Sequence, residues 1–349
     1  MHEDLKQIAR ARPFSSFAEL CDALEKTTKR LEKRRLLSSF LRLLKEDEIS
    51  PTASFLLGKP LPEGSKRPLG IGYKMVLNII SKHKQATLTS APLTVLQVYE
   101  YFSKISAVSG KGSQTKKEAL LEGLLSRATP NESKYIIRLV LGEMRIGVVE
   151  GMVMEAISAA IGVKKDLVRR SYTCLGSLEE VACIALKYGK QGLENVAIKI
   201  FTPVRPMLAE ISESVAEVLR QHGGKTAFEY KFDGARIQIH KAGDRIKIFS
   251  RRMTDATTAL PDLEKLARGE IHADNFIVEG EVVATGPDGK PLPFQDLMRR
   301  FRRLDEVEQM VKEIPLRLYL FDLLYLNQPL IELPYCERWN LLSKICEPK

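Results

Sequence analysis

Apolar side chains recur at helical spacing through the first two hundred residues of the chain. The segment 129–140 opens on Thr129 as a capping residue, continues with proline at the first helical position, and has Glu132 three residues after the cap. A second predicted buried face has the spacing i, i+3, i+4 and i+7 and consists of Val149, Met152, Val153 and Ala156. This half of the chain therefore predicts a set of packed amphipathic helices.

The pattern changes near residue 200. A proline-stiffened connector, Thr202–Pro206, precedes short β-rich runs at 237–240, 246–249, 276–278, 282–284 and 317–321. A helix is expected at Leu260–Arg268 and a turn at 286–289. We predict a multidomain chain, with an all-α domain over residues 1–201 and an α+β domain, built on a mainly antiparallel sheet, over residues 202–349. No internal repeat is evident.

The composition adds expectations about location and partners. The chain carries 54 basic and 44 acidic side chains, and the net charge of +10 favours a polyanionic partner, nucleic acid first. No apolar run approaches the ~20 residues of a membrane-spanning helix, and the N-terminus lacks the pattern of a secretory signal. The five cysteines form no C-x-x-C pair, which disfavours a disulfide framework or a zinc ribbon. We therefore expect a cytoplasmic protein with no membrane contact.

Two basic clusters are candidates for phosphate contact. The first has six lysines and arginines between Lys26 and Arg35, and the second has four arginines around Phe301, at 299–303. Guanidinium and ammonium groups suit phosphate oxygens, although a solvated helix face explains either cluster equally well. The five histidines are isolated in the sequence, and we assign no metal-ligating residue.

One segment has the character of a reactive centre. Within 229–236, Lys231 lies in an apolar, alternating run and is followed by Asp233 and Gly234. A lysine in such a strand is expected to be partly desolvated, which lowers the pKa of the amine and makes it a better nucleophile. Gly234 would let the backbone turn sharply beside the reacting group, and Arg236 would add a fixed positive charge.

This segment resembles motif I of the ATP-dependent DNA ligases, which are covalent nucleotidyltransferases together with RNA ligases and mRNA capping enzymes. Further stretches resemble ligase motifs in the family's order, at 250–257, 278–283, 293–303 and 318–324. Segments 69–72, 142–147 and 205–209 resemble the helical DNA-binding domain and connector of archaeal and eukaryotic-type ligases. The resemblance covers essentially the whole chain, and it implies a nucleotidyltransferase fold for the α+β domain.

The resemblance also implies a role for each matching residue. Lys231 would attack the α-phosphate of ATP, release pyrophosphate and become lysyl-AMP, with Mg²⁺ neutralising charge on the phosphates. Nucleotide contacts would come from Glu229 (the adenine amino group), Arg236 and Arg251 (sugar or phosphate, later the nick), Glu281 (ribose or a metal-associated water) and Phe321 (stacking on adenine). Glu279, two residues before Glu281, either is structural or shares the site.

The sequence departs from the family pattern near its end. The family has a later Glu-Gly-hydrophobic-Met-hydrophobic-Lys motif, a Lys-x-Lys motif and an oligonucleotide-binding barrel, and none follows Phe321. Glu150-Gly151-Met152-Val153-Met154 imitates the first of these, but it precedes Lys231 and ends in Glu155. We therefore expect the adenylation domain to be incomplete, the barrel to be absent, and the chain alone to be unable to seal nicks.

The sequence thus predicts an ATP-dependent DNA ligase, or the front part of one, that acts on nicked double-stranded DNA. The expected cofactors are ATP and Mg²⁺, a sliding clamp is a candidate partner, and the complete protein is expected to be a monomer. The main alternative is a non-catalytic module that binds duplex DNA independently of sequence. An RNA ligase or capping enzyme ranks lower, because neither explains the long helical half.

Overall fold

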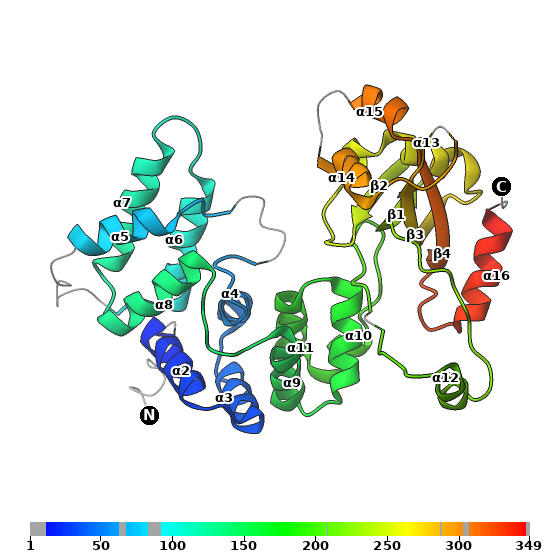
Figure 1. The fold of residues 1–349 in the computed structure, drawn as a ribbon. Helices are drawn as coiled ribbons and strands as arrows, with labels where there is room; N and C mark the ends of the chain where they lie inside the picture. Colours follow the sequence, from blue (N-terminus) through cyan, green and yellow to red (C-terminus); the bar gives the residue numbers. More distant parts are fainter. Residues whose placement is uncertain are drawn as a thin grey trace. The chain divides into compact units, whose positions relative to one another are not determined.

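The computed structural model describes residues 12–62, 68–82, 92–207, 209–286, 288–302 and 307–346 (Figure 1). Contacts divide the chain into two compact units. The helical unit comprises residues 1–172 and 177–196, and the sheet unit comprises residues 173–176 and 197–349. The sequence-based expectation of a helical region followed by an α+β region with an antiparallel sheet is confirmed.

The helical unit is built from helices of ten to seventeen residues. They are α2 (Phe14–Lys26), α3 (Arg30–Leu41), α4 (Glu46–Leu56), α5 (Tyr73–Lys82), α6 (Val95–Ala107), α7 (Ser113–Leu125), α8 (Pro130–Leu141), α9 (Glu150–Ile161), α10 (Lys165–Leu175) and α11 (Leu178–Glu194). The ring of Phe55 lies at the centre of the aromatic core, with its centroid 5.8 Å from those of Phe17 and Phe102. Around this core, α3 packs against α9, and α11 packs against both α4 and α9.

The helix starts show how far local sequence decides the elements. The predicted start at Thr129 is confirmed, because its hydroxyl accepts a hydrogen bond from the Glu132 backbone N–H at 3.3 Å and the Glu132 carboxylate accepts one from the Thr129 N–H at 2.8 Å. The predicted face beginning at Val149 is partly wrong. Val149 precedes α9 and is 65% exposed, whereas Val153 and Ala156 are buried. Because Val149 is the capping residue of α9, the buried face begins one helical turn later, at Val153.

Two glycine turns in the helical unit are each held by a buried lysine. Lys33 of α3 donates a hydrogen bond to the Ile146 carbonyl at 2.6 Å, and Lys117 of α7 donates one to the Leu69 carbonyl at 2.6 Å. The next residue is in each case a glycine with positive φ, 65° at Gly147 and 63° at Gly70. The first turn leads towards α9 and the second towards α5, so that each lysine fixes the backbone just before another helix.

The sheet unit contains one four-stranded antiparallel sheet in the order β2-β1-β3-β4. The strands are β1 (Ala235–Ala242), β2 (Arg245–Ser250), β3 (Asn275–Ala284) and β4 (Leu316–Leu326). Its helices are α12 (Val215–Gln221), η1 (Thr257–Ala259), α13 (Pro261–Glu270), α14 (Phe294–Arg302), α15 (Val307–Glu313) and α16 (Tyr335–Ile345). The expected helix near 260–268 is α13, and the runs at 276–278 and 282–284 belong to the single strand β3. Pro287 of the predicted turn at 286–289 lies outside the described residues.

The two faces of the sheet have different chemistry. Ile237 and Ile239 of β1 point into an apolar core that also contains Leu263 of α13 and Leu297 of α14. The alternate residues of the same strand, Arg236, Gln238 and His240, belong to the opposite face. Because Gln238 and His240 are buried there, the second face needs polar partners, and these position the site described next.

Candidate active site

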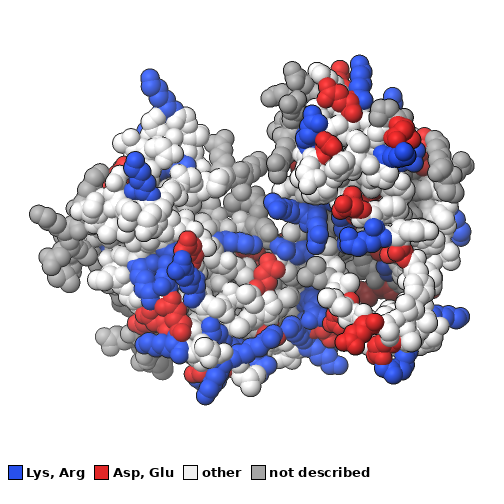
Figure 2. All heavy atoms as spheres, in the orientation of Figure 1, with Lys and Arg blue, Asp and Glu red and all other residues white. Residues whose placement is uncertain are grey.

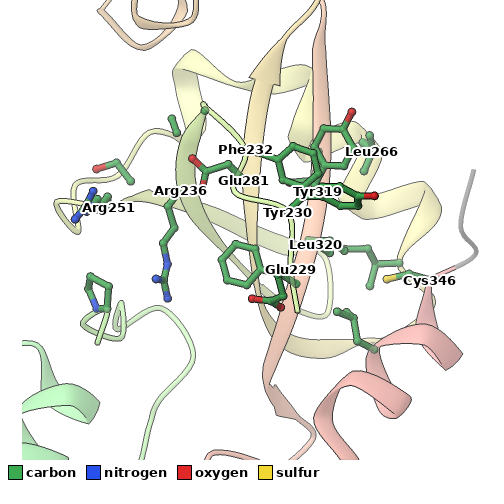
Figure 3. Close-up of a pocket in the computed structure, with 18 of the residues that line it drawn as sticks. Glu229, Tyr230, Phe232, Arg236, Arg251, Leu266, Glu281, Tyr319, Leu320 and Cys346 are labelled. Carbon is green, nitrogen blue, oxygen red and sulfur yellow. The ribbon is translucent and has the colours of Figure 1, made fainter. Parts of the chain in front are cut away.

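One cleft of the sheet unit, with a volume of about 3920 Å³, contains every residue that the sequence assigned to nucleotide chemistry. These residues come from the segment before β1, from β1, from the turn after β2, and from β3 and β4: Glu229, Lys231, Arg236, Arg251, Glu281 and Phe321. Figure 3 shows Arg236, Arg251 and Glu281 around one part of this cleft. The fold thus gathers residues that are far apart in sequence.

Lys231 does not have the surroundings expected from the sequence. It precedes β1 by four residues, and its side chain is exposed. The expectation of a partly desolvated lysine within a strand is therefore wrong for this structure. The alternating pattern that suggested a strand begins only after Gly234, because residues 233–234 form a bend that separates the lysine from the sheet.

Gly234 is required by a close approach between backbone segments. A Cβ atom added at Gly234 would lie 2.3 Å from the carbonyl oxygen of Val282 and 2.9 Å from Cγ of Glu281. Any side chain at this position would push the segment that carries Lys231 away from β3. Gly234 therefore sets the distance between the lysine segment and Glu281.

Glu281 lies where several charges converge. Burial raises the pKa of its carboxyl group above the ordinary value, and Arg236, Lys231 and Arg251 each oppose that rise. A hydrogen bond from the Gly234 backbone acts in the same direction as the three cations. One half-buried carboxylate thus faces three basic side chains, an arrangement that suits the phosphates and ribose of a nucleotide.

Aromatic rings form another wall of the cleft (Figure 3). Phe232 stacks on Tyr319, with ring centroids 4.1 Å apart and an angle of 15° between the planes. Phe321 lies under the guanidinium of Arg236, whose Cζ is 5.3 Å from the ring centroid. Neither Phe232 nor Tyr319 was assigned a role from the sequence. The available signal was that Tyr319 precedes Phe321 by two residues and so shares its side of β4.

Glu229 and Glu279 each have a protein partner at the cleft. The hydroxyl of Tyr335 in α16 hydrogen-bonds to the Glu229 carboxylate and lies 3.1 Å from the Phe321 carbonyl. Glu279, whose role the sequence left open, is only 4% exposed and forms an ion pair with Arg236. Burial raises the pKa of the Glu279 carboxyl group, and Arg236 is the first group that opposes this. Glu279 is therefore a buried partner of a cleft residue.

The two predicted basic clusters are partly interior. Lys33 is 8% exposed and holds the Ile146 turn, and Arg300 of α14 is 1% exposed and forms an ion pair with Asp262 at 2.5 Å. Neither side chain is accessible to a phosphate. Arg303 lies outside the described residues. Other lysines and arginines are spread over the visible face among acidic side chains (Figure 2).

Neither a cluster of metal ligands nor a membrane-spanning helix is present in the described part of the chain. No group of three or more His, Cys, Asp or Glu side chains there could hold a metal ion together. No helix there has the length and apolar character needed to cross a membrane.

The sequence matches two protein-family descriptions in tandem. Residues 13–83 and 78–158 match "DNA ligase N terminus", and residues 206–349 match "ATP dependent DNA ligase domain". A DNA ligase of Thermococcus fumicolans is 39% identical over 364 residues, which cover 96% of this chain and 65% of the relative. A DNA ligase of Methanothrix thermoacetophila is 39% identical over 368 residues, covering 96% and 66%. The chain thus spans slightly less than two thirds of the length of these relatives.

A solved structure, Pmar-Lig_PreS3, shares the fold. Its TM-score is 0.52 at 17% sequence identity, and the match covers 94% of this chain and 62% of that one.

Proposed function

Because the chain belongs to the ATP-dependent DNA ligase family, we propose that it transfers AMP from ATP to Lys231 as the first step of DNA strand joining. One observation carries the proposal: six residues from four separate segments, each matching a family motif, line the same cleft. The match of the helical half to a DNA ligase family also favours DNA over RNA as the strand to be joined.

The proposed step is a displacement at phosphorus. The deprotonated Nζ of Lys231 attacks the α-phosphorus of ATP, a nitrogen–phosphorus bond forms, and the bond to the bridging oxygen breaks. Pyrophosphate leaves with that electron pair, and the nitrogen, positively charged once it has bonded to phosphorus, releases one proton to water. The exposed position of Lys231 gives ATP access to this amine, and the Gly234 bend keeps it near Glu281.

The other cleft residues suit binding and orientation of ATP. Arg236 and Arg251 would contact phosphate or sugar oxygens, and Phe321 would stack on adenine. The Nε of Arg236 is buried and has no hydrogen-bond partner among the described residues. Glu229 would accept a hydrogen bond from the adenine amino group, because a carboxylate already bonded to Tyr335 still has free acceptor positions.

The residues of the cleft also fit Mg²⁺. This ion keeps most of its waters and needs only one or two protein carboxylates beside substrate phosphates, so that a cluster of three acids is unnecessary. Glu281 is the carboxylate that would hold the ion or one of its waters. When bound, Mg²⁺ neutralises charge that develops on the transferring phosphate.

The helical unit would bind the DNA in this proposal. The AMP group would pass from Lys231 to the 5′-phosphate at a nick, and the 3′-hydroxyl would then displace AMP and join the strand. Binding of duplex DNA through phosphate contacts would be independent of sequence and would weaken steeply with salt. This second part extends to activities of the longer relatives, of which the chain covers 65–66%.

Replacement of the nucleophile tests the proposal. The wild type, Lys231→Ala and the matched control Lys290→Ala are incubated with ATP labelled at the α-phosphate, and the covalent label is measured after denaturation. Lys290 is 82% exposed and is paired with Asp288 at the surface. We expect loss of the label in Lys231→Ala, full labelling of the control, and unchanged binding of nicked duplex in all three proteins.

The outcomes separate the two candidate functions. An unlabelled wild type that binds duplex DNA would favour the non-catalytic module. Labelling of Lys231→Ala at the wild-type level would show that another residue is the nucleophile.

A further inference from the structure

A buried row of polar side chains runs along one face of β1. Arg236, Gln238 and His240 occupy alternate positions of this strand, and Gln238 and His240 are 6% and 0% exposed. The row begins in the cleft at Arg236 and continues under residues 201–205. These residues overlap the predicted connector Thr202–Pro206 and form the connector segment. The row therefore joins the nucleotide site to a segment of the sheet unit that precedes the first strand.

The amide of Gln238 uses its full hydrogen-bonding capacity. Its oxygen accepts a bond from the Val204 N–H at 2.9 Å and lies 3.3 Å from Nε2 of His240. Its nitrogen donates to the Val204 carbonyl and, at 2.8 Å, to Oε1 of Glu279. Two acceptor contacts and two donor contacts saturate a carboxamide, so that its orientation is fixed.

Glu279 connects Gln238 to Arg236 through the two oxygens of its carboxylate. Gln238 and Glu279 are direct register partners on β1 and β3. Oε1 of Glu279 accepts from Gln238, and Oε2 accepts from Nη2 of Arg236. The guanidinium then lies over the Phe321 ring, with Nε left without a partner among the described residues. The place of Arg236 in the cleft thus depends on a carboxylate whose own place is fixed by Gln238.

The connector segment is held on both sides. Phe201 has a φ of 68°, which is rare for a residue other than glycine, and its N–H donates to Nδ1 of His240 at 3.0 Å. On the other side, the Arg205 N–H donates to the Thr173 carbonyl at 3.0 Å, and its side chain donates to the Gly176 carbonyl at 2.9 Å. The segment therefore has a defined position against which Gln238 is set.

We propose that Gln238 is a positioning residue for nucleotide binding: anchored on the connector segment, it orients Glu279, which holds Arg236 against the nucleotide. The proposal rests on the proposed function. It assigns a role to a side chain that touches no substrate and acts through two others. It also makes the connector segment part of the support of the nucleotide site.

A double-mutant cycle tests this role. The dissociation constant for α,β-methylene-ATP, which cannot transfer AMP, is measured for wild type, Gln238→Leu, Arg236→Ala and the double variant. We expect Gln238→Leu to weaken binding about tenfold, because a hydrogen bond that orients a charged pair is lost. The double variant should bind as Arg236→Ala does. Gln309→Leu, an exposed site on α15, is the matched control and should bind as the wild type does.

A second variant covers loss of folding. If circular dichroism shows that Gln238→Leu is unfolded, Glu279→Gln takes its place in the cycle, since it keeps the shape and removes the charge that holds Arg236. The same non-additivity is expected. Wild-type affinity in Gln238→Leu, or in Glu279→Gln where that variant takes its place, would overturn the proposal. Effects on affinity that add to that of Arg236→Ala would overturn it too. A wild type that does not bind the analogue would refute the proposed function itself, and the positioning role with it.

Discussion

Buried polar groups are used differently in the two units. In the helical unit, Lys33 and Lys117 each donate only to backbone carbonyls of one turn, and the two sets of contacts share no residue. In the sheet unit, His240 and Gln238 bond to each other and to the connector segment, Gln238 also bonds to Glu279, and the row ends at Arg236 in the cleft. Mutations that remove separate contacts should lower the free energy of unfolding by amounts that add, whereas mutations within a shared network should not. The helical unit thus fixes local turns, and the sheet unit fixes a site.

Replacing one glycine in each unit tests this contrast. The replacement in the sheet unit should have the largest effect on AMP transfer. Gly234→Ala would place a Cβ 2.3 Å from the Val282 carbonyl, so that the segment carrying Lys231 must move away from Glu281. We expect AMP transfer to fall about a hundredfold or more, because a shift of about 1 Å at reacting groups has effects of this size. The measurement is the rate of covalent labelling from ATP.

The control for this prediction lies in the helical unit. A Cβ added at Gly123 of α7 would meet nothing within 4 Å, and φ there is not positive. Gly123→Ala should leave labelling unchanged and raise the helix stability by about 0.5–1 kcal/mol. Normal labelling of Gly234→Ala would mean that the spacing between Lys231 and Glu281 does not govern the reaction.

The gathering of motif residues in one cleft was open to prediction because each motif carries its own local signature. What surrounds those residues was less accessible. Gln238 and His240 read as the polar half of an alternating strand, which says nothing of the backbone atoms that cover them. Lys33 and Arg300 counted as surface charge, since helical spacing alone does not show which face another helix will bury. In both cases the deciding contacts come from distant segments.

The two glycine turns held by Lys33 and Lys117 could not be predicted from the sequence for a similar reason. The stretches Leu69-Gly70 with Met75-Val76, and Ile146-Gly147 with Met152-Val153, share the same spacing, but four matching positions are too few to indicate a repeat. The correspondence is visible only because α3 and α7 supply equivalent lysines to the two turns.

Acid should lower the stability of the two units over different pH ranges. Burial lowers the pKa of His240 from 6.5 to about 3, so that the folded sheet unit keeps this ring neutral. Its contribution to stability is complete above pH 6.5 and is lost as the pH falls towards 3. We expect protonation of the His240 ring by itself to remove about 2–3 kcal/mol from the stability of the sheet unit between about pH 7 and about pH 4.5. Trp339 of α16 is the single tryptophan of the chain, so that its fluorescence reports the unfolding of this unit.

The helical unit should respond at lower pH. Although burial alone would raise the pKa of Asp22, hydrogen bonds from Tyr135, Lys134 and Asn131 lower it from 3.8 to about 2. Its contribution is therefore lost only as the pH falls from about 4 towards 2.

The variant His240→Gln tests the source of the pH dependence of the sheet unit. Its amide oxygen can still accept a bond from the Phe201 N–H, and it should flatten the slope of unfolding free energy against pH between pH 7 and 4.5. An unchanged slope would exclude His240 as its source.

The two lysines give the smallest effects and test the comparison most directly. Lys33→Met and Lys117→Met should each lower the free energy of unfolding of the helical unit by about 1–2 kcal/mol, because each leaves a turn carbonyl without its donor. Urea unfolding followed by far-ultraviolet circular dichroism measures this, with the exposed Lys116→Met as control. Since the contacts share no partner, the double variant should lose the sum of the two effects. A marked departure from that sum would show that the turns before α5 and α9 are coupled. The contrast with the shared network around Gln238 would then fail.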